Sequence, residues 1–166
     1  MKTLAPFFDA MTNRVKGEKT RRDGLKFEKI VKELLDCGAV DAGSALVKWT
    51  HLSPDGGPDG ARDFERIRGG QKEWAEAKNY KDNISLKQLG PTLVIAKNED
   101  VKRLLVFSAS SLNENTERHI AQYRASTEIS IEVFQDEGLE RLILDHLSEE
   151  SFKQYFGSCK PKNRHN

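Results

Sequence analysis

Two strand patterns joined by a glycine turn constrain the fold of this 166-residue chain more than any other feature. Residues 63–68 and 74–78 both read as strands, and Gly69-Gly70-Gln71-Lys72 supplies a tight turn between them. The two strands are therefore expected to pair antiparallel, as a hairpin. Side chains at positions i and i+2 of a strand share a face, so Glu76 and Lys78 should point the same way while Ala77 packs behind them.

The segment before the hairpin is expected to be mainly helical. From Asp23 onward, apolar residues recur at helical spacing, and Cys37-Gly38 supplies the stop. These apolar residues are Phe27, Ile30, Val31, Leu34 and Leu35. Residues 45–50 read as a first strand and residues 51–60 as a loop. Residues 1–23 are expected to contain a short helix and a solvated basic run.

After the hairpin, helices and strands alternate. Helices are expected over residues 86–98, 113–125 and 137–147, and strands over 103–108 and 130–134. The first of these helices contains Gly90-Pro91, which is tolerable near a first turn or at a kink. Strand-helix-strand order implies parallel pairing. The predicted fold class is α/β, with a mixed β-sheet that contains an antiparallel hairpin and is flanked by helices.

Composition narrows the class of protein. Lys and Arg number 27 against 26 Asp and Glu, so the net charge of +1 is not that of a protein that coats DNA. No apolar run is long enough for a membrane span, and the first residues do not form a secretory signal. Cys37 and Cys159 lack metal-ligand spacing and read as reduced thiols, so a cytoplasmic protein is expected. The four histidines show no ligand spacing, and no phosphate-binding loop motif occurs.

Two acids and a lysine indicate a metal site for phosphodiester cleavage. Asp59, in the turn-forming segment 54–60, could bring a second carboxylate to Glu76 and Lys78. Asp55 and Asp63 are alternatives to Asp59 for this role. Carboxylate oxygens suit Mg²⁺ or Mn²⁺, and a nearby lysine can orient or deprotonate the attacking water. The alanines that flank Glu76 predict that it is buried, and a buried acid needs a partner or a metal.

The order of these pieces resembles the PD-(D/E)xK nuclease superfamily, and within it the Mrr-type restriction endonuclease domains. The resemblance covers residues 24–147 and implies a restriction-endonuclease-like core. It is carried by the acid-bearing helix 24–35, the turn Gly56-Gly57-Pro58-Asp59-Gly60, the strand Glu76-Ala77-Lys78, the glutamine-containing segment 83–89 and the strand 104–110 that ends in Ser108 and Ser110. Many relatives have Gln-x-Lys, whereas this chain has Glu76, which favours metal binding.

The resemblance also implies a role for each matching residue. Asp59, Glu76 and the Ala77 carbonyl would hold Mg²⁺, with Mn²⁺ as the alternative, and Lys78 would act on the water and the phosphate. Glu28 would contribute a further acid near the metal. Gln88 would orient DNA or a ligand.

The expected function is that of a metal-dependent endonuclease acting on double-stranded DNA. It would be the effector domain of a larger bacterial anti-phage defence or restriction protein, with a fused sensor or ATPase module and a homodimer or higher oligomer for double-strand cleavage. Residues 1–23 would form an N-terminal helical extension, 24–147 the nuclease domain, and 148–166 a C-terminal helix and linker tail. A catalytically silent nucleic-acid-binding module of the same fold, or a Holliday-junction or RNA nuclease, are the alternatives.

Overall fold

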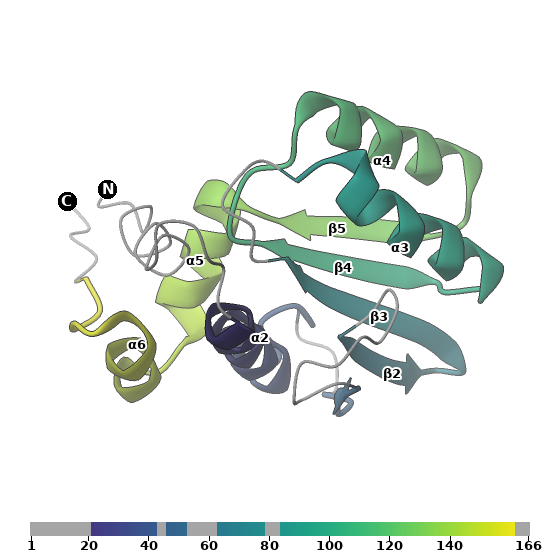
Figure 1. The fold of residues 1–166 in the computed structure, drawn as a ribbon. Helices are drawn as coiled ribbons and strands as arrows, with labels where there is room; N and C mark the ends of the chain where they lie inside the picture. Colours follow the sequence, from purple (N-terminus) through teal and green to yellow (C-terminus); the bar gives the residue numbers. More distant parts are fainter. Residues whose placement is uncertain (1–20, 43–45, 53–62, 79–83, 162–166) are drawn as a thin grey trace.

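The chain folds as an α/β protein around one mixed sheet. The computed structural model describes residues 21–42, 46–52, 63–78 and 84–161, and within those ranges it contains five helices and five strands. In chain order these are α2 (Arg21–Asp36), β1 (Thr50–His51), β2 (Phe64–Arg68), β3 (Gln71–Lys78), α3 (Leu86–Asn98), β4 (Arg103–Ser108), α4 (Glu114–Ser126), β5 (Ser130–Phe134), α5 (Asp136–His146) and α6 (Glu149–Phe156). The strand order in the sheet is β1-β2-β3-β4-β5. Figure 1 labels β2 to β5 in this order.

The predicted hairpin is formed by β2 and β3. Its turn residues Gly69 and Gly70 have φ angles of 59° and 75°. Glycine adopts this left-handed region without steric cost, and two such residues in succession match the twist of paired strands. The antiparallel register runs from Phe64 opposite Ala75 to Arg68 opposite Gln71. The turn thus fixes which residues of the two strands face each other.

The second half of the sheet is parallel. β3 pairs with β4, and β4 pairs with β5, each in parallel register. α3 connects β3 to β4, and α4 connects β4 to β5. The helix-connected crossovers place the carboxyl ends of all three strands at the same edge of the sheet, where Lys78 lies beside Ser108.

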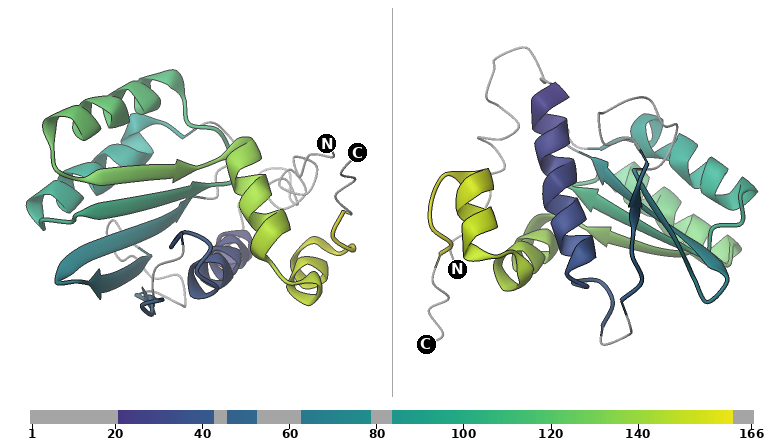
Figure 2. Two further views of the ribbon diagram at one scale, coloured as in Figure 1. Left: turned by 180° about the vertical axis from the view of Figure 1, so that it is seen from behind. Right: turned by 90° about the horizontal axis from the view of Figure 1, so that it is seen from below.

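Helices cover both faces of the sheet. α2 and α5 lie on one face, whereas α3 and α4 lie on the other, as the view from below shows (Figure 2). Alternating side chains of β3 serve the two layers: Ala75 belongs to the core on the α2 side and Trp74 to the core on the α3 side. Phe152 of α6 joins the core on the α2 side.

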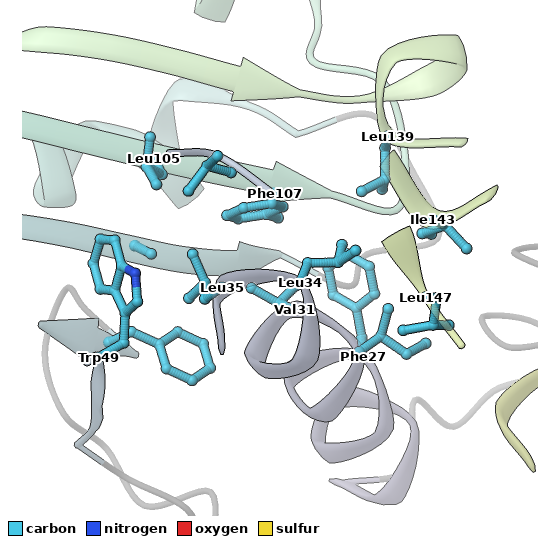
Figure 3. Packing of buried hydrophobic residues seen from close by; sticks show 14 of the residues in the cluster. Phe27, Val31, Leu34, Leu35, Trp49, Leu105, Phe107, Leu139, Ile143 and Leu147 are labelled. Atoms are coloured by element: carbon cyan, nitrogen blue, oxygen red, sulfur yellow. The ribbon is translucent and has the colours of Figure 1, made fainter. Parts of the chain in front are cut away.

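The amphipathic face of α2 is the centre of the first core. All five residues predicted to line that face are fully buried, namely Phe27, Ile30, Val31, Leu34 and Leu35. They pack against side chains of β4 and α5, among which Phe107, Leu139 and Ile143 are seen in Figure 3. The helix ends at Asp36, and Gly38 follows with a φ of 75° that suits a helix stop. The predicted helix and its stop are therefore confirmed.

A cluster of charged side chains is buried in the hairpin half of the sheet. Arg66 donates from Nε to Glu73 Oε1 at 3.0 Å and from Nη1 to Asp41 Oδ2 at 3.2 Å. Its guanidinium carbon lies 4.2 Å from the ring centroid of Trp49. Arg103 and Arg68 also lie within ion-pair distance of Asp41. Every buried charge of this cluster therefore has an opposite charge beside it, as burial requires.

The prediction of a strand over residues 45–50 is wrong. Of its residues that the structure describes, only Thr50 is in β1, which continues to His51. The apolar segment before it is used for packing, because Trp49 is only 2% exposed and the Val47 carbonyl accepts a hydrogen bond from Arg66. β3 also begins earlier than predicted, at Gln71. The other predicted helices and strands of the described ranges agree with the structure to within two residues.

Two further predictions, the N-terminal helix and the lack of a membrane span, can be compared only with the described residues. The short helix expected within residues 1–23 falls almost wholly outside the described residues. In the parts of the chain that the structure does describe, no helix combines the length and the apolar character needed to cross a membrane.

Candidate active site

Glu76 meets Asp63, the alternative to Asp59, at the carboxyl end of β3. Phe64 pairs with Ala75, so the next step of the antiparallel register brings Asp63 opposite Glu76. β3 ends two residues later, at Lys78. Open α/β sheets bind their ligands outside the carboxyl ends of their strands. The fold therefore gathers two acids and a lysine at the edge where such sites form.

Asp63 is held by the main chain of β3. Its Oδ2 accepts a hydrogen bond from the N–H of Ala77 at 2.7 Å. Its own N–H donates to the Ala75 carbonyl at 3.2 Å. In a regular antiparallel ladder, an N–H of β3 would donate to a main-chain carbonyl of β2. Here the Asp63 carboxylate takes the place of that carbonyl as the acceptor for the Ala77 N–H. This contact fixes the carboxylate near the plane of the sheet, between the two helical layers.

Glu76 is a buried acid, as predicted, with an exposed fraction of 4%. Its Oε1 forms an ion pair with Nζ of Lys78, which lies on the same face of β3. Burial raises the pKa of Glu76 to about 7, although the charge of Lys78 and the hydroxyl of Thr92 act in the opposite direction. Among the described residues, Oε2 of Glu76 has no hydrogen-bond partner. A buried carboxylate oxygen without a partner is costly, so this atom is suited to bind a ligand from outside the chain.

Glu28 approaches Asp63 from the other side of the sheet, on α2. Burial, the negative charge of Asp63 and a hydrogen bond with Asp63 raise the pKa of Glu28 to about 7. Burial also raises the pKa of Asp63, although the Ala77 N–H and the charge of Lys78 favour its charged form. Two carboxyl groups in contact are costly when both are charged, so the pair retains a proton to a higher pH than either acid would alone.

His51 of β1 is a member of the site that the sequence did not indicate. Its Nε2 lies 3.1 Å from Oε2 of Glu28. Its ring stacks on Phe64, with the ring centroids 4.5 Å apart. Glu28 and His51 are 23 residues apart, so only the packing of α2 against β1 and β2 brings them together.

The other predicted site residues are either outside the described residues or engaged in contacts within the fold. Asp59 and Asp55 lie outside the described residues, and Asp63, the remaining alternative, is the acid that the structure places at Glu76. Gln88 forms a capping box at the start of α3, where its side-chain oxygen accepts the Ser85 N–H at 2.8 Å. The prediction that Gln88 orients DNA or a ligand stays a prediction.

The donors at the site fit a hard divalent cation. The side-chain donors of Asp63 and Glu76 are carboxylate oxygens, which Mg²⁺ and Mn²⁺ prefer. The N–H and carbonyl of one strand residue point to the same side, so the Ala77 carbonyl faces the same way as the N–H that binds Asp63. Within the described ranges, no three His, Cys, Asp or Glu side chains gather as a metal-binding group. The available set is therefore two carboxylates and a main-chain carbonyl, and Mg²⁺ commonly keeps several waters besides a few such ligands.

Comparisons of this chain with protein-family models, with curated proteins and with solved structures return no match.

Proposed function

We propose that this chain is a metal-dependent nuclease that hydrolyses phosphodiester bonds in DNA, built on a restriction-endonuclease-like core. One observation carries the proposal: Asp63 is hydrogen-bonded to the main chain of the residues on either side of Glu76, and Lys78 shares the face of Glu76. Two acids and a lysine in this arrangement form the site that the resemblance of the sequence to PD-(D/E)xK nucleases implies. Asp63 takes the role that the sequence assigned to Asp59.

Asp63, Glu76 and the Ala77 carbonyl would hold Mg²⁺ or Mn²⁺. When bound, such a cation polarises the scissile phosphate and lowers the pKa of a coordinated water. The buried Glu76 Oε2, which has no hydrogen-bond partner among the described residues, supports this assignment because a cation would satisfy it.

Lys78 supplies the positive charge of the chain at this site. Its side chain is 14% exposed and pairs with Glu76. An ammonium group held in a water-poor site can orient the attacking water and stabilise the charge that builds on the phosphate during attack. The ion pair with Glu76 keeps the ammonium in place before substrate arrives.

Glu28 gives the site a group that exchanges protons near neutral pH. With a pKa raised to about 7 and a position beside Asp63, it can accept a proton released during hydrolysis. The Glu28 carboxyl then holds that proton until it passes to solvent.

One site per chain can cut one strand at a time, so we propose that two copies act together on double-stranded DNA. The charge of +1 over the chain gives little general attraction to DNA. Targeting would then come from a fused sensor or ATPase module of a bacterial defence or restriction protein.

A plasmid cleavage assay tests the proposal. Wild-type protein, Lys78→Ala and the matched control Lys72→Ala are incubated with supercoiled plasmid in Mg²⁺ or Mn²⁺, and with EDTA. Lys72 is on the same strand, 33% exposed, and pairs with Glu99 at 3.6 Å. We expect cleavage by wild type and Lys72→Ala only with metal, and a loss of about 10²–10³-fold in Lys78→Ala.

Three outcomes would contradict this proposal. Cleavage that persists in Lys78→Ala removes the lysine from the mechanism. Absence of cleavage by folded wild-type protein on plasmid, on four-way junctions and on RNA indicates a silent binding module, whereas cleavage of junctions or RNA alone reassigns the substrate.

A further inference from the structure

His51 is fixed on both sides by the described residues around it. Its register partner across β1 and β2 is Phe64, and the two rings stack with an interplanar angle of 24°. Its Nε2 lies 3.1 Å from Glu28 Oε2, and the two side chains are only 11% and 15% exposed. An aromatic stack on one side and a hydrogen bond on the other leave the ring little freedom.

The hydrogen bonds at this point form a continuous series. Nε2 of His51 donates to Oε2 of Glu28 when the ring carries its proton on that nitrogen. The carboxyl group of Glu28 is in turn hydrogen-bonded to that of Asp63. Asp63 accepts in turn from the Ala77 N–H. This series of hydrogen bonds therefore connects His51 to the carboxylate of Asp63, which lies next to Glu76.

We propose that His51 is a positioning residue that holds the Glu28 carboxyl against Asp63 and thereby sets the orientation of Asp63 at the cation site. The proposal rests on the proposed function for the role of Asp63. Partners that orient metal ligands from behind change metal affinity or activity by about 10–100-fold when removed. His51 is expected to act within that range without touching DNA.

Two substitutions separate the hydrogen bond from the packing. His51→Phe keeps an aromatic ring on Phe64 and removes the donor, whereas His51→Gln places an amide N–H near the position of Nε2 and loses the stack. His119→Phe is the matched control, since His119 lies on α4 beside Tyr123, with ring centroids 5.1 Å apart. If His51→Phe does not fold, His51→Leu takes its place.

Three measurements are made on each variant: Mn²⁺ affinity by calorimetry, kcat and KM for plasmid cleavage, and the melting temperature. We expect His51→Phe to lower Mn²⁺ affinity and kcat by about 10–100-fold at unchanged KM and melting temperature. His51→Gln should regain most of the Mn²⁺ affinity and most of kcat. His119→Phe should have the wild-type values of both. A purely structural role would instead lower the melting temperature, and His51→Gln, which loses the stack, would not restore metal affinity.

The outcomes separate this inference from the proposed function. If wild type binds Mn²⁺ but cuts nothing, the nuclease proposal fails while the Mn²⁺ series still tests His51. If wild type binds no Mn²⁺, a crystal structure of His51→Phe decides: Glu28 displaced from Asp63 supports positioning, and Glu28 in place overturns it. Wild-type affinity and kcat in His51→Phe, or equal losses in His51→Phe and His51→Gln, also overturn it.

Discussion

The Asp63 carboxylate accepts a hydrogen bond from the main-chain N–H of Ala77 at 2.7 Å. This bond ties the residue that precedes β2 to the end of β3. This contact holds a carboxylate next to Glu76 and near the charge of Lys78.

Asp63→Asn should lose plasmid cleavage and Mn²⁺ binding together, because the amide keeps the shape of the side chain but not its charge. Loss of such an interaction is expected to cost about 10²-fold or more in kcat. Cleavage and calorimetric titration of Asp63→Asn and Asp59→Asn measure this directly. Full activity in Asp63→Asn with none in Asp59→Asn would return the role to Asp59.

Glu76→Gln should change how stability depends on pH. The pKa of Glu76 is raised from 4.5 to about 7, so the stability contributed by its protonated form is present below about pH 4.5 and is lost as the pH rises through 7. Glutamine stays neutral, so the unfolding free energy of Glu76→Gln relative to wild type should increase by on the order of 3 kcal/mol from pH 4.5 to pH 8. Urea unfolding in EDTA at several pH values measures it. A constant difference across that range would show that Glu76 has an ordinary pKa.

Asp41→Asn should destabilise the fold by roughly 3–5 kcal/mol, because it leaves the buried Arg66 guanidinium short of a charged partner. The hydrogen bond from Arg66 lowers the pKa of Asp41, so this contribution is present above about pH 3.8 and is lost as the pH falls through the lower folded value. The control is Asp36→Asn, whose pair with Lys32 is on the surface and contributes about 0–1 kcal/mol. Equal melting temperatures for both variants would contradict the role of the buried cluster.

Phe27→Ala should destabilise the protein by roughly 3–5 kcal/mol, since the side chain is fully buried between α2 and α5. Leu46→Ala serves as the control, because Leu46 is 54% exposed and its truncation should change stability by about 0.5 kcal/mol or less. Chemical denaturation of the two variants provides the comparison. A small effect at Phe27 would contradict its assignment to the buried face of α2.

The regular part of the fold was predictable because its signals are local. Helical spacing in α2 and the apolar run of β4 each report burial within a short window, and both elements appear where the pattern places them. The strand predicted over residues 45–50 was wrong because apolar side chains in this segment pack in the tertiary structure. Trp49 is buried against Arg66 without forming a strand. A local pattern cannot distinguish these two uses of apolar side chains.

Of the candidate site, the pairing of Glu76 with Lys78 was predictable from the sequence, whereas the contacts of Asp63 and His51 were not. Glu76 and Lys78 are two residues apart on one strand, so their shared face follows from strand geometry alone. The choice of Asp63 required the register of the hairpin, because Asp55, Asp59 and Asp63 all belong to one turn-rich stretch of sequence. His51 was missed since its partner Glu28 comes from a helix 23 residues earlier, and no spacing rule links the two.

The position of Asp63 between the two helical layers affects where in the chain inactivating substitutions are expected. Glu28 reaches it from the layer of α2, and Glu76 contacts Thr92 of α3 on the opposite face. A substitution that loosens either layer shifts one carboxyl relative to the other. A random-mutagenesis screen for inactive clones should therefore return hits scattered through both cores, many in folded protein and far from any residue that meets the substrate.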